Sequence, residues 1–248
     1  MLKIIFSICL TMSFANGLNI KTSYDVSYGI FGHLGYADAK IQTDKNNNYK
    51  IHINAYTTGL VNSLSNGLQE SYTSEGIYEN NRFKPYRFTK ITSKKTKIKI
   101  RNFYFDYDKK QITLKKTVKK LKNGVWKEEI KKETVKYWAK EDILSLFFNI
   151  KHYVKNINKS NKKSILAIGA GNSNGGKIDI EVPIGEKRET IAGYLQSDKN
   201  ILIVKIYNKI FSSSNGEMFL KLDNNGLCEL SILKDVLLFG DIIGKRKI

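Results

Sequence analysis

The chain contains 248 residues, and its 42 Lys and Arg against 23 Asp and Glu give a formal net charge of +19. An apolar fraction of 41% is sufficient for a packed core and excludes a largely disordered chain. With only 2 Cys and 3 His, the composition also excludes a disulfide-rich scaffold and an array of zinc fingers.

Residues 1–15 are typical of a secretory signal peptide. Lys3 provides the positive end, an apolar stretch follows it, and the small side chains of Ser13 and Ala15 predict cleavage before Asn16. The apolar stretch is too short to cross a hydrocarbon core of ~30 Å, so we interpret it as a signal and not as an anchor. We therefore expect residues 16–248 to form a single β-rich domain in the periplasm, either free there or peripheral to a membrane.

Most of the chain after this segment alternates apolar and polar residues with a period of two. Tyr49, Ile51 and Ile53, for example, share one face of a predicted strand. Dipeptides such as Asn123-Gly124 separate the alternating runs and predict tight hairpin turns. Many long strands joined by tight turns predict a mainly β fold, either a curved antiparallel sheet or a partly open β-barrel.

Two predicted strands carry specific structural expectations. In one strand the apolar positions change phase, from Ile98 and Ile100 to Phe103 and Phe105. Such a change predicts a β-bulge or a bend near Arg101-Asn102. In another, near the C-terminus, alternation places Cys228 on one face with Leu230 and Ile232, where it should be buried as a small apolar side chain.

Positive charge is concentrated between Arg82 and Lys136, where 20 basic and 5 acidic residues give a net charge of +15. Because burying several ammonium groups is prohibitively costly, we predict that a Lys-rich hairpin at about 112–138 extends beyond the packed core. Its candidate contacts to an anionic surface are Lys115, Lys116, Lys119, Lys120 and Lys122. A solvated strand face without a partner is the alternative. Arg is scarce in the chain, which disfavours specific recognition of nucleic acid.

One segment, from Glu141 to Val154, has helical periodicity instead. Its apolar side chains recur at spacings of three and four residues, and Glu141 and Asp142 lie where a helix N-terminus favours acids. We expect one principal helix packed on the sheet. It either plugs the open face of the curved sheet or forms a lid over an apolar ligand cavity.

Two motifs resemble catalytic or nucleotide-binding sites without their context. Gly171 to Gly175 match Gly-x-Ser-x-Gly, but an alternating strand follows and the last histidine, His152, precedes the Ser. A P-loop reading of the same segment fails because Ile178 stands where a hydroxyl should hold Mg²⁺. The three histidines share no metal-ligand spacing. We therefore predict no catalytic residue, no metal site, no cofactor and no bound nucleotide, and we expect that the protein is not an enzyme.

The order of several segments resembles a bacterial exported family catalogued as domain of unknown function 3108. The segments are Tyr24 to Tyr28, Gly35 to Ala39, Tyr72 to Gly76, Phe83 to Phe88, Phe105 to Asp108, Glu141 to Phe148 and the late pair Met218 to Asp223 and Gly226 to Leu233. The resemblance implies an exported, mostly antiparallel β protein of the cell envelope, and it transfers no catalytic site.

The resulting functional expectation is a non-enzymatic periplasmic envelope protein of a Gram-negative cell, with a binding or assembly role such as handling of lipids or lipoproteins. Its expected partners are envelope proteins or lipids, including an anionic membrane surface. A structural accessory of a surface machine, such as the flagellar motor, is the alternative, and a periplasmic hydrolase is a more remote one.

Overall fold

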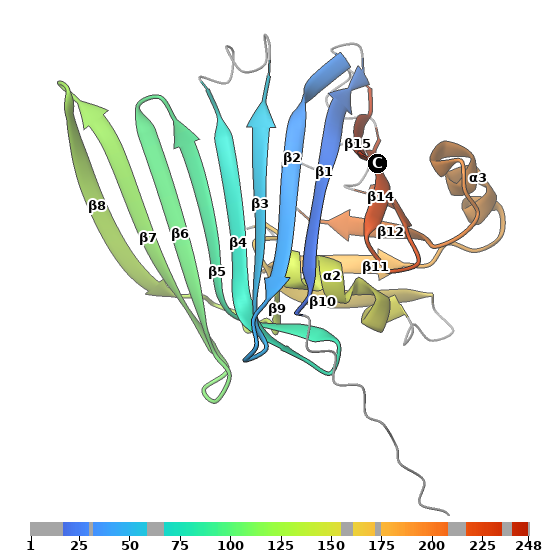
Figure 1. Cartoon of the computed structure of the whole chain (residues 1–248), viewed down its shortest axis with the longest axis horizontal. Helices are drawn as coiled ribbons and strands as arrows, with labels where there is room; N and C mark the ends of the chain where they lie inside the picture. The colour runs from blue at the N-terminus through green and yellow to red at the C-terminus, as the bar shows by residue number, and fades with distance from the viewer. Residues whose placement is uncertain are drawn as a thin grey trace, which may run out of the picture.

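The computed structural model describes residues 17–29, 32–58, 67–154, 161–171, 175–207, 217–234 and 240–247 (Figure 1). The predicted signal peptide lies outside these residues. The strands are β1 (Asn19–Tyr28), β2 (Gly32–Thr43), β3 (Asn48–Thr57), β4 (Gln69–Glu79), β5 (Arg82–Lys94), β6 (Lys97–Asp106), β7 (Gln111–Lys122), β8 (Val125–Thr134), β9 (Glu141–Asp142), β10 (Lys162–Ile168), β11 (Lys177–Glu181), β12 (Ile201–Ile206), β13 (Glu217–Leu222), β14 (Cys228–Leu233) and β15 (Ile242–Arg246). The helices are α2 (Ile143–Val154) and α3 (Gly185–Leu195).

All fifteen strands belong to one sheet, in the order β8-β7-β6-β5-β4-β3-β2-β1-β15-β14-β13-β12-β11-β10-β9. Neighbouring strands are antiparallel, except that the short β9 is parallel to β10. The sheet bends strongly: β1–β8 form a wall, and β10–β12 cross beneath it (Figure 1). Because β8 and β9 are not paired with each other, the sheet is open. The predicted fold class, a curved antiparallel sheet with a principal helix, is confirmed.

Helix α2 lies against the concave side of this sheet, which we call the inner face. Leu144 packs into an apolar cluster with residues of β2, β3 and β5–β7, such as Ile51 and Phe88. Leu146 and Ile150 pack into a second cluster formed by β10–β14. The helix therefore bridges the two halves of the curved sheet, and its wide apolar surface explains the helical periodicity of the sequence.

The N-terminus of α2 is fixed by buried carboxylates, as the acidic residues before the helix indicated. Asp142 is fully buried, and its Oδ1 accepts hydrogen bonds from the backbone N–H groups of Leu144 and Ser145 at 2.8 and 3.0 Å. Its Oδ2 accepts a hydrogen bond of 2.5 Å from Ser74 of β4, whose hydroxyl also lies 2.9 Å from the Tyr49 hydroxyl of β3. Asp142 thus ties the helix to two strands of the wall.

Glu141 extends the same polar cluster toward the other end of α2. It accepts hydrogen bonds from Ser145 at 2.7 Å, from Tyr153 at 2.7 Å and from Asn149 at 3.0 Å. Asn149 in turn bonds both the N–H and the C=O of Phe83 at the start of β5. Burial raises the pKa of Glu141 and raises that of Asp142 to about 7.

The sequence did not predict the second helix, α3. It is weakly amphipathic, and only Ile191 and Leu195 are buried, one turn apart, against Ile201 and Ile203 on the outer face of β12. Pro183 shortly before it and Glu186 in its first turn were the available signals. Neither helix in the described part of the chain is long and apolar enough to cross a membrane.

The structure corrects two expectations about strand faces. Cys228 is buried as predicted, but a register shift between Cys228 and Leu230 places it with Leu222 on the inner face, while Leu230 packs on the outer face. Conversely, β6 pairs with β5 and β7 without any register shift, so it contains no bulge near Arg101. Its apolar residues therefore change face along a regular strand.

We predict that Asp142→Asn reduces the pH dependence of stability. Because the folded-state pKa lies near 7, above the ordinary value of 3.8, the folded protein retains a proton that the unfolded chain loses between about pH 4 and pH 7. The stabilising contribution is complete below about pH 4 and is lost as the pH rises through 7. The amide introduced by the substitution preserves the helix-capping oxygen without an ionisable proton.

The measurement is the free energy of unfolding in urea at several pH values for both proteins. We expect wild type to lose several kcal/mol relative to the variant between about pH 4 and pH 8. Asp44→Asn, in an exposed turn where hydrogen bonds lower the pKa, should show the opposite trend and serves as control. A constant difference between wild type and Asp142→Asn across this range would contradict the assignment.

Candidate anion-binding site at the hairpin ends

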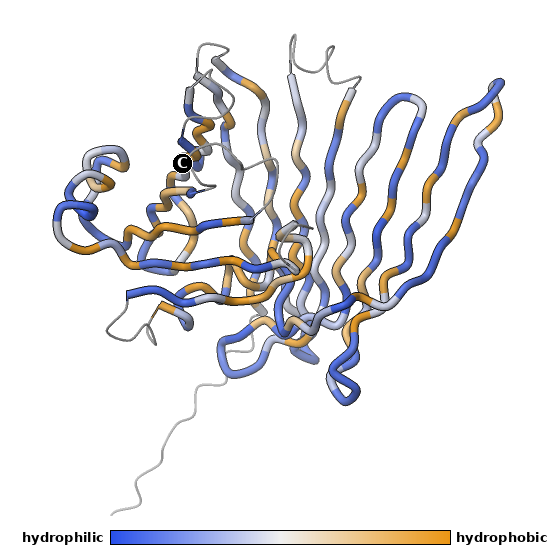
Figure 2. The backbone as a smooth tube through the Cα atoms, turned by 180° about the vertical axis from the view of Figure 1, so that it is seen from behind, coloured by the Kyte–Doolittle hydropathy of each residue, from blue (hydrophilic) through white to orange (hydrophobic). Residues whose placement is uncertain are grey.

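The Lys-rich segment folds into two adjacent hairpins, β5–β6 and β7–β8, at one end of the wall. The β7–β8 turn consists of Asn123 and Gly124, both with positive φ, as a type I′ turn requires. Such a turn fixes the register, so that Lys120 lies opposite Lys127. Figure 2 shows that the turns of both hairpins are hydrophilic.

Four lysines stand directly opposite one another across these strands. Lys94 of β5 pairs with Lys97 of β6, Lys97 pairs with Lys120 of β7, and Lys120 pairs with Lys127 of β8. At a strand spacing of ~4.8 Å, the row spans roughly 14 Å of the inner face. Within the described residues, none of the four ammonium groups forms a hydrogen bond or an ion pair, although Glu129 on the same face attracts Lys120 electrostatically. Lysines directly opposite one another destabilise a sheet, so this row is an electrostatic cost to the fold.

A second row of cations lies four residues further along each strand, on the same face, and is largely neutralised. It comprises Lys90, Arg101, Lys116 and Lys131. Lys90 pairs with Glu70 at 2.9 Å, Lys116 with Glu133 at 2.5 Å and Lys131 with Glu129 at 2.9 Å. The row nearest the turns is therefore the one that lacks carboxylate partners.

Lys99, between the two rows, reports the positive potential of this surface. Repulsion by Lys97, followed by partial burial and then by repulsion from Arg101, Lys94 and Lys120, lowers the pKa of its ammonium group. An anion bound here would relieve that repulsion.

The structure separates the five lysines predicted to contact an anionic surface. Lys116 and Lys120 lie on the inner face, and Lys122 is exposed at the turn. Lys115 and Lys119 lie on the outer face, where Lys119 pairs with Glu128 at 3.0 Å.

We define the cationic rim as the lysines at the hairpin ends that have no ion pair in the described part of the chain: Lys94, Lys95, Lys97, Lys120, Lys122 and Lys127. Four of them, Lys94, Lys95, Lys97 and Lys127, are not among the lysines predicted from the sequence, because cross-strand register and not local pattern groups them at the hairpin ends. The signal was present, since two-residue turns place Lys94 opposite Lys97 and Lys120 opposite Lys127.

Apolar side chains occupy the outer face behind the rim. Ile98 and Ile100 of β6 lie on this face, as do Trp126 and Ile130 of β8, which are 45% and 51% exposed. The polarity of the wall is therefore inverted toward the hairpin ends, with cations on the inner face and apolar groups on the outer one. This inversion explains why the apolar residues of β6 change phase without a bulge.

The apolar space under α2 is small. A cavity of about 40 Å³ is lined by α2 and by inner-face residues of β11–β13, including Phe147, Ile180 and Met218. A volume of this size does not accommodate an acyl chain, so here α2 acts as a plug and not as a lid.

The histidines and the glycine-rich turn show no catalytic arrangement among the described residues. His52 contacts the Thr73 hydroxyl at 2.8 Å, and His152 contacts the Asn81 carbonyl at 2.7 Å. The described residues contain no group of three or more His, Cys, Asp or Glu that could hold a metal ion. The Ser of the Gly-x-Ser-x-Gly motif lies outside the described residues, and strand β11 follows the Gly175-Gly176 turn.

The fold and this surface define a β protein of the open, curved-sheet type with a cationic end. Residues 23–149, slightly more than half of the chain, match the family described as Protein of unknown function (DUF3108). The chain belongs to this family, which confirms the resemblance seen in the sequence. The family segment includes β2–β9 and the rim.

A search of curated proteins finds no match to this chain. Among solved structures, the chain is similar to a crystal structure described as a beta-barrel-like protein of domain of unknown function DUF1849 from Brucella abortus. The two chains are 9% identical with a TM-score of 0.40, and the similarity covers 94% of this chain and 97% of the other.

We predict that Lys97→Glu stabilises the protein. The new carboxylate would lie opposite both Lys94 and Lys120, replacing two repulsive cross-strand pairs with two attractive ones. Each replaced pair should raise the free energy of unfolding by roughly 0.2–1 kcal/mol at low salt. Urea unfolding of both proteins measures this, with Lys199→Glu, in an exposed turn, as the charge-matched control. Equal or lower stability of Lys97→Glu would show that the row carries no repulsion.

Proposed function

We propose that the protein is a non-enzymatic binding or assembly protein of the periplasm, and that its cationic rim contacts an anionic lipid surface. The row of four opposed lysines without carboxylate partners carries this proposal. A surface that is maintained against its own repulsion is suited to an anionic partner, and anionic headgroups contribute about 1 kcal/mol for each suitably placed lysine. The signal-like segment at 1–15 supports export to the compartment where such surfaces occur.

The position of the rim supports contact with a surface. Both hairpin turns lie at the free end of the wall, away from α2 (Figure 1), so contact there does not require the core to open. Val125 and Trp126 follow the β7–β8 turn directly and are 61% and 45% exposed. A tryptophan beside lysines is typical of side chains that settle at the boundary between lipid headgroups and hydrocarbon.

Other expected roles receive less support from the geometry. Carriage of an acyl chain under α2 is disfavoured by the 40 Å³ volume of that cavity. A structural accessory of a surface machine would use the same rim to bind an acidic protein, and the experiment below distinguishes this role from lipid binding.

Vesicle co-sedimentation tests the proposal with a rim variant, in which Lys94, Lys97, Lys120 and Lys127 are replaced by Gln. We expect wild type to bind vesicles containing phosphatidylglycerol at low salt, to bind neutral phosphatidylcholine vesicles weakly, and to dissociate as salt screens the charges. The rim variant should lose most of its binding to the anionic vesicles. The fluorescence of Trp126 should shift to shorter wavelength when wild type is mixed with anionic vesicles, and should not shift for the rim variant or with neutral vesicles.

The matched control replaces Lys21, Lys45, Lys199 and Lys245 by Gln, which removes the same charge from lysines outside the rim. It should bind anionic vesicles nearly as well as wild type. Equal binding by wild type and the rim variant, or equal losses in the rim and control variants, would refute a specific role for the rim. Failure of wild type to bind anionic vesicles would refute lipid contact and leave the protein-binding accessory as the better explanation.

A further inference from the structure

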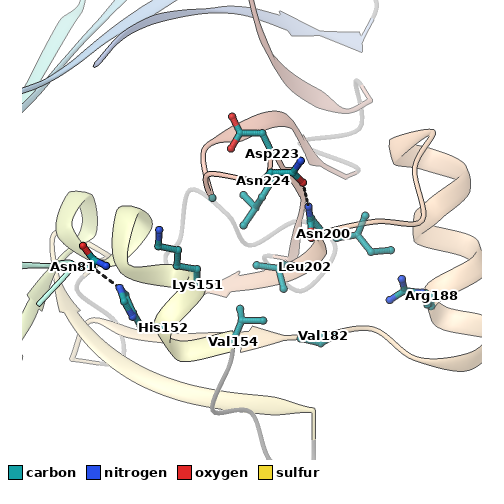
Figure 3. Close-up of a pocket in the computed structure, with 13 residues that line it drawn as sticks. Asn81, Lys151, His152, Val154, Val182, Arg188, Asn200, Leu202, Asp223 and Asn224 are labelled. Carbon is teal, nitrogen blue, oxygen red and sulfur yellow. Dashed lines mark hydrogen bonds between the residues drawn. The ribbon is translucent and has the colours of Figure 1, made fainter. Parts of the chain in front are cut away.

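A cavity of about 560 Å³, open to solvent, lies beside the C-terminal end of α2 (Figure 3). Lys151 of α2 and Arg188 of α3 line it from opposite sides, and apolar residues such as Leu202 lie between them. Because the two cations do not converge on one charged group, we assign no ligand to this cavity. The free edge of the wall has more specific chemistry.

Strand β8 forms that free edge. It is the last strand in the sheet order and the outermost strand of the wall (Figure 1), and all ten of its residues are exposed. Its pairing with β7 contains no register shift, and the strand contains no proline or glycine. A long, regular edge strand is a template for pairing with another chain, and the bulges and prolines that often protect an edge are missing from β8.

Backbone alternation determines which groups of β8 face outward. The N–H of Val135 donates to the Ile112 carbonyl of β7 at 2.9 Å, so the odd-numbered residues of β8 direct their N–H and C=O groups to β7. The even-numbered residues, from Trp126 to Thr134, direct theirs away from the sheet. Another antiparallel strand bonds β8 only if its own outward-facing residues lie opposite these.

The side chains of β8 favour a second copy of β8 as that strand. In an antiparallel pair of two copies centred on Ile130, outward-facing residues meet one another, and each charged side chain faces one of opposite sign on the same face of the sheet. Lys127 faces Glu133, Glu128 faces Lys132, and Glu129 faces Lys131. Twofold symmetry makes each of these attractive contacts twice.

The same charges oppose the neighbouring registers. A pair centred on Glu129 would place Lys127 opposite Lys131, and a pair centred on Lys131 would place Glu129 opposite Glu133. Charged side chains commonly protect an edge strand, but those of β8 instead select one register in which all of them meet an opposite charge.

The carboxylates of β8 have capacity for a second lysine. In the ion pairs of the described residues, Glu128, Glu129 and Glu133 each use one oxygen. The other oxygen of each is therefore left to accept a lysine from a second copy.

We propose that the protein forms a symmetric dimer through antiparallel pairing of β8 with β8 of a second copy, centred on Ile130. The sheet then continues from one copy to the other, and Ile130, 51% exposed in a single chain, contacts its equivalent on the outer face. Because the paired strands are antiparallel, the two rims lie at opposite ends of the shared sheet. The interface uses only Lys127 of the rim and needs no lipid, so it does not rest on the proposed lipid contact.

Sedimentation equilibrium of wild type without lipid measures the association. We expect a reversible dimer, since one strand from each copy is a small contact, and we expect salt to weaken it. Lys132→Glu should weaken dimerisation about tenfold or more, because it turns two attractive contacts with Glu128 into repulsive ones. Within its own chain Lys132 lies opposite Lys115, so the same substitution does not weaken the hairpin.

Rescue by mixing distinguishes contact between copies from damage to the fold. Glu128→Lys alone should also dimerise poorly, and an equimolar mixture with Lys132→Glu should regain wild-type affinity, because each copy then supplies the charge that the other lacks. Lys199→Glu, which makes the same charge change outside β8, should dimerise like wild type. Ile130→Pro removes an outward-facing N–H and no bond to β7, so it should abolish the dimer and leave the circular dichroism unchanged.

Cysteine crosslinking identifies the register. In the proposed pair, Glu129 and Lys131 of the two copies lie opposite each other without mutual hydrogen bonds, at a Cα separation of ~4.5 Å that a disulfide spans. A mixture of Glu129→Cys and Lys131→Cys should therefore crosslink under oxidation, whereas either variant alone should not; the native Cys228 is buried. Wild type that stays monomeric at every measured concentration, a dimer that survives Ile130→Pro, or equal crosslinking by the single variants would overturn the proposal.

Discussion

The burial of α2 against the inner face is the interaction on which the rest of the structure depends. An open sheet of fifteen strands has no closed barrel to cover its inner side, so one helix must supply apolar contacts to both halves. Asp142 accepts hydrogen bonds from Ser74 of β4 and from the first turn of the helix. Glu141 accepts one from Asn149, which in turn bonds Phe83 of β5, and together these bonds fix where the helix begins. Burial raises the pKa of both carboxyl groups and so disfavours their ionised forms, while their hydrogen bonds hold the helix in a defined position.

The direction of α2 also determines where the core ends. The helix runs across the strands of the wall near one end of them (Figure 1), whereas β5–β8 contain ten to thirteen residues and extend to roughly 33–43 Å. Among the described residues, no apolar cluster reaches the inner face at the hairpin ends of these strands, where polar side chains can meet water. This limited coverage explains why Phe103 and Phe105 face the core while Ile98 and Ile100, on the same strand, face outward.

Sequence periodicity was sufficient to predict the strands, the openness of the fold and the position of α2, because each of these depends on local alternation or on helical spacing. It failed where a face is decided by long-range geometry. The shift at β14 that moves Cys228 to the inner face depends on pairing with β13. The change of face of the apolar residues along β6 depends on how much of the strand α2 covers. The cavity beside α2 and α3 is lined by residues that are distant in sequence, such as Lys151 and Arg188, so no local motif could indicate it.

The need for a wet inner face does not by itself explain lysine at the hairpin ends. On the same face, the ends of β1–β4 carry mostly neutral side chains such as Val26, Ala37 and Ala55, and neutral Thr or Gln would satisfy water on β5–β8 equally well. Opposed lysines instead lower stability, and the apolar clusters around α2 must offset that cost from a distance. Solvation does not require this cost in stability, and the neighbouring strands avoid it. Such a cost is expected on a surface that binds an anionic partner, because the partner then supplies the missing negative charges.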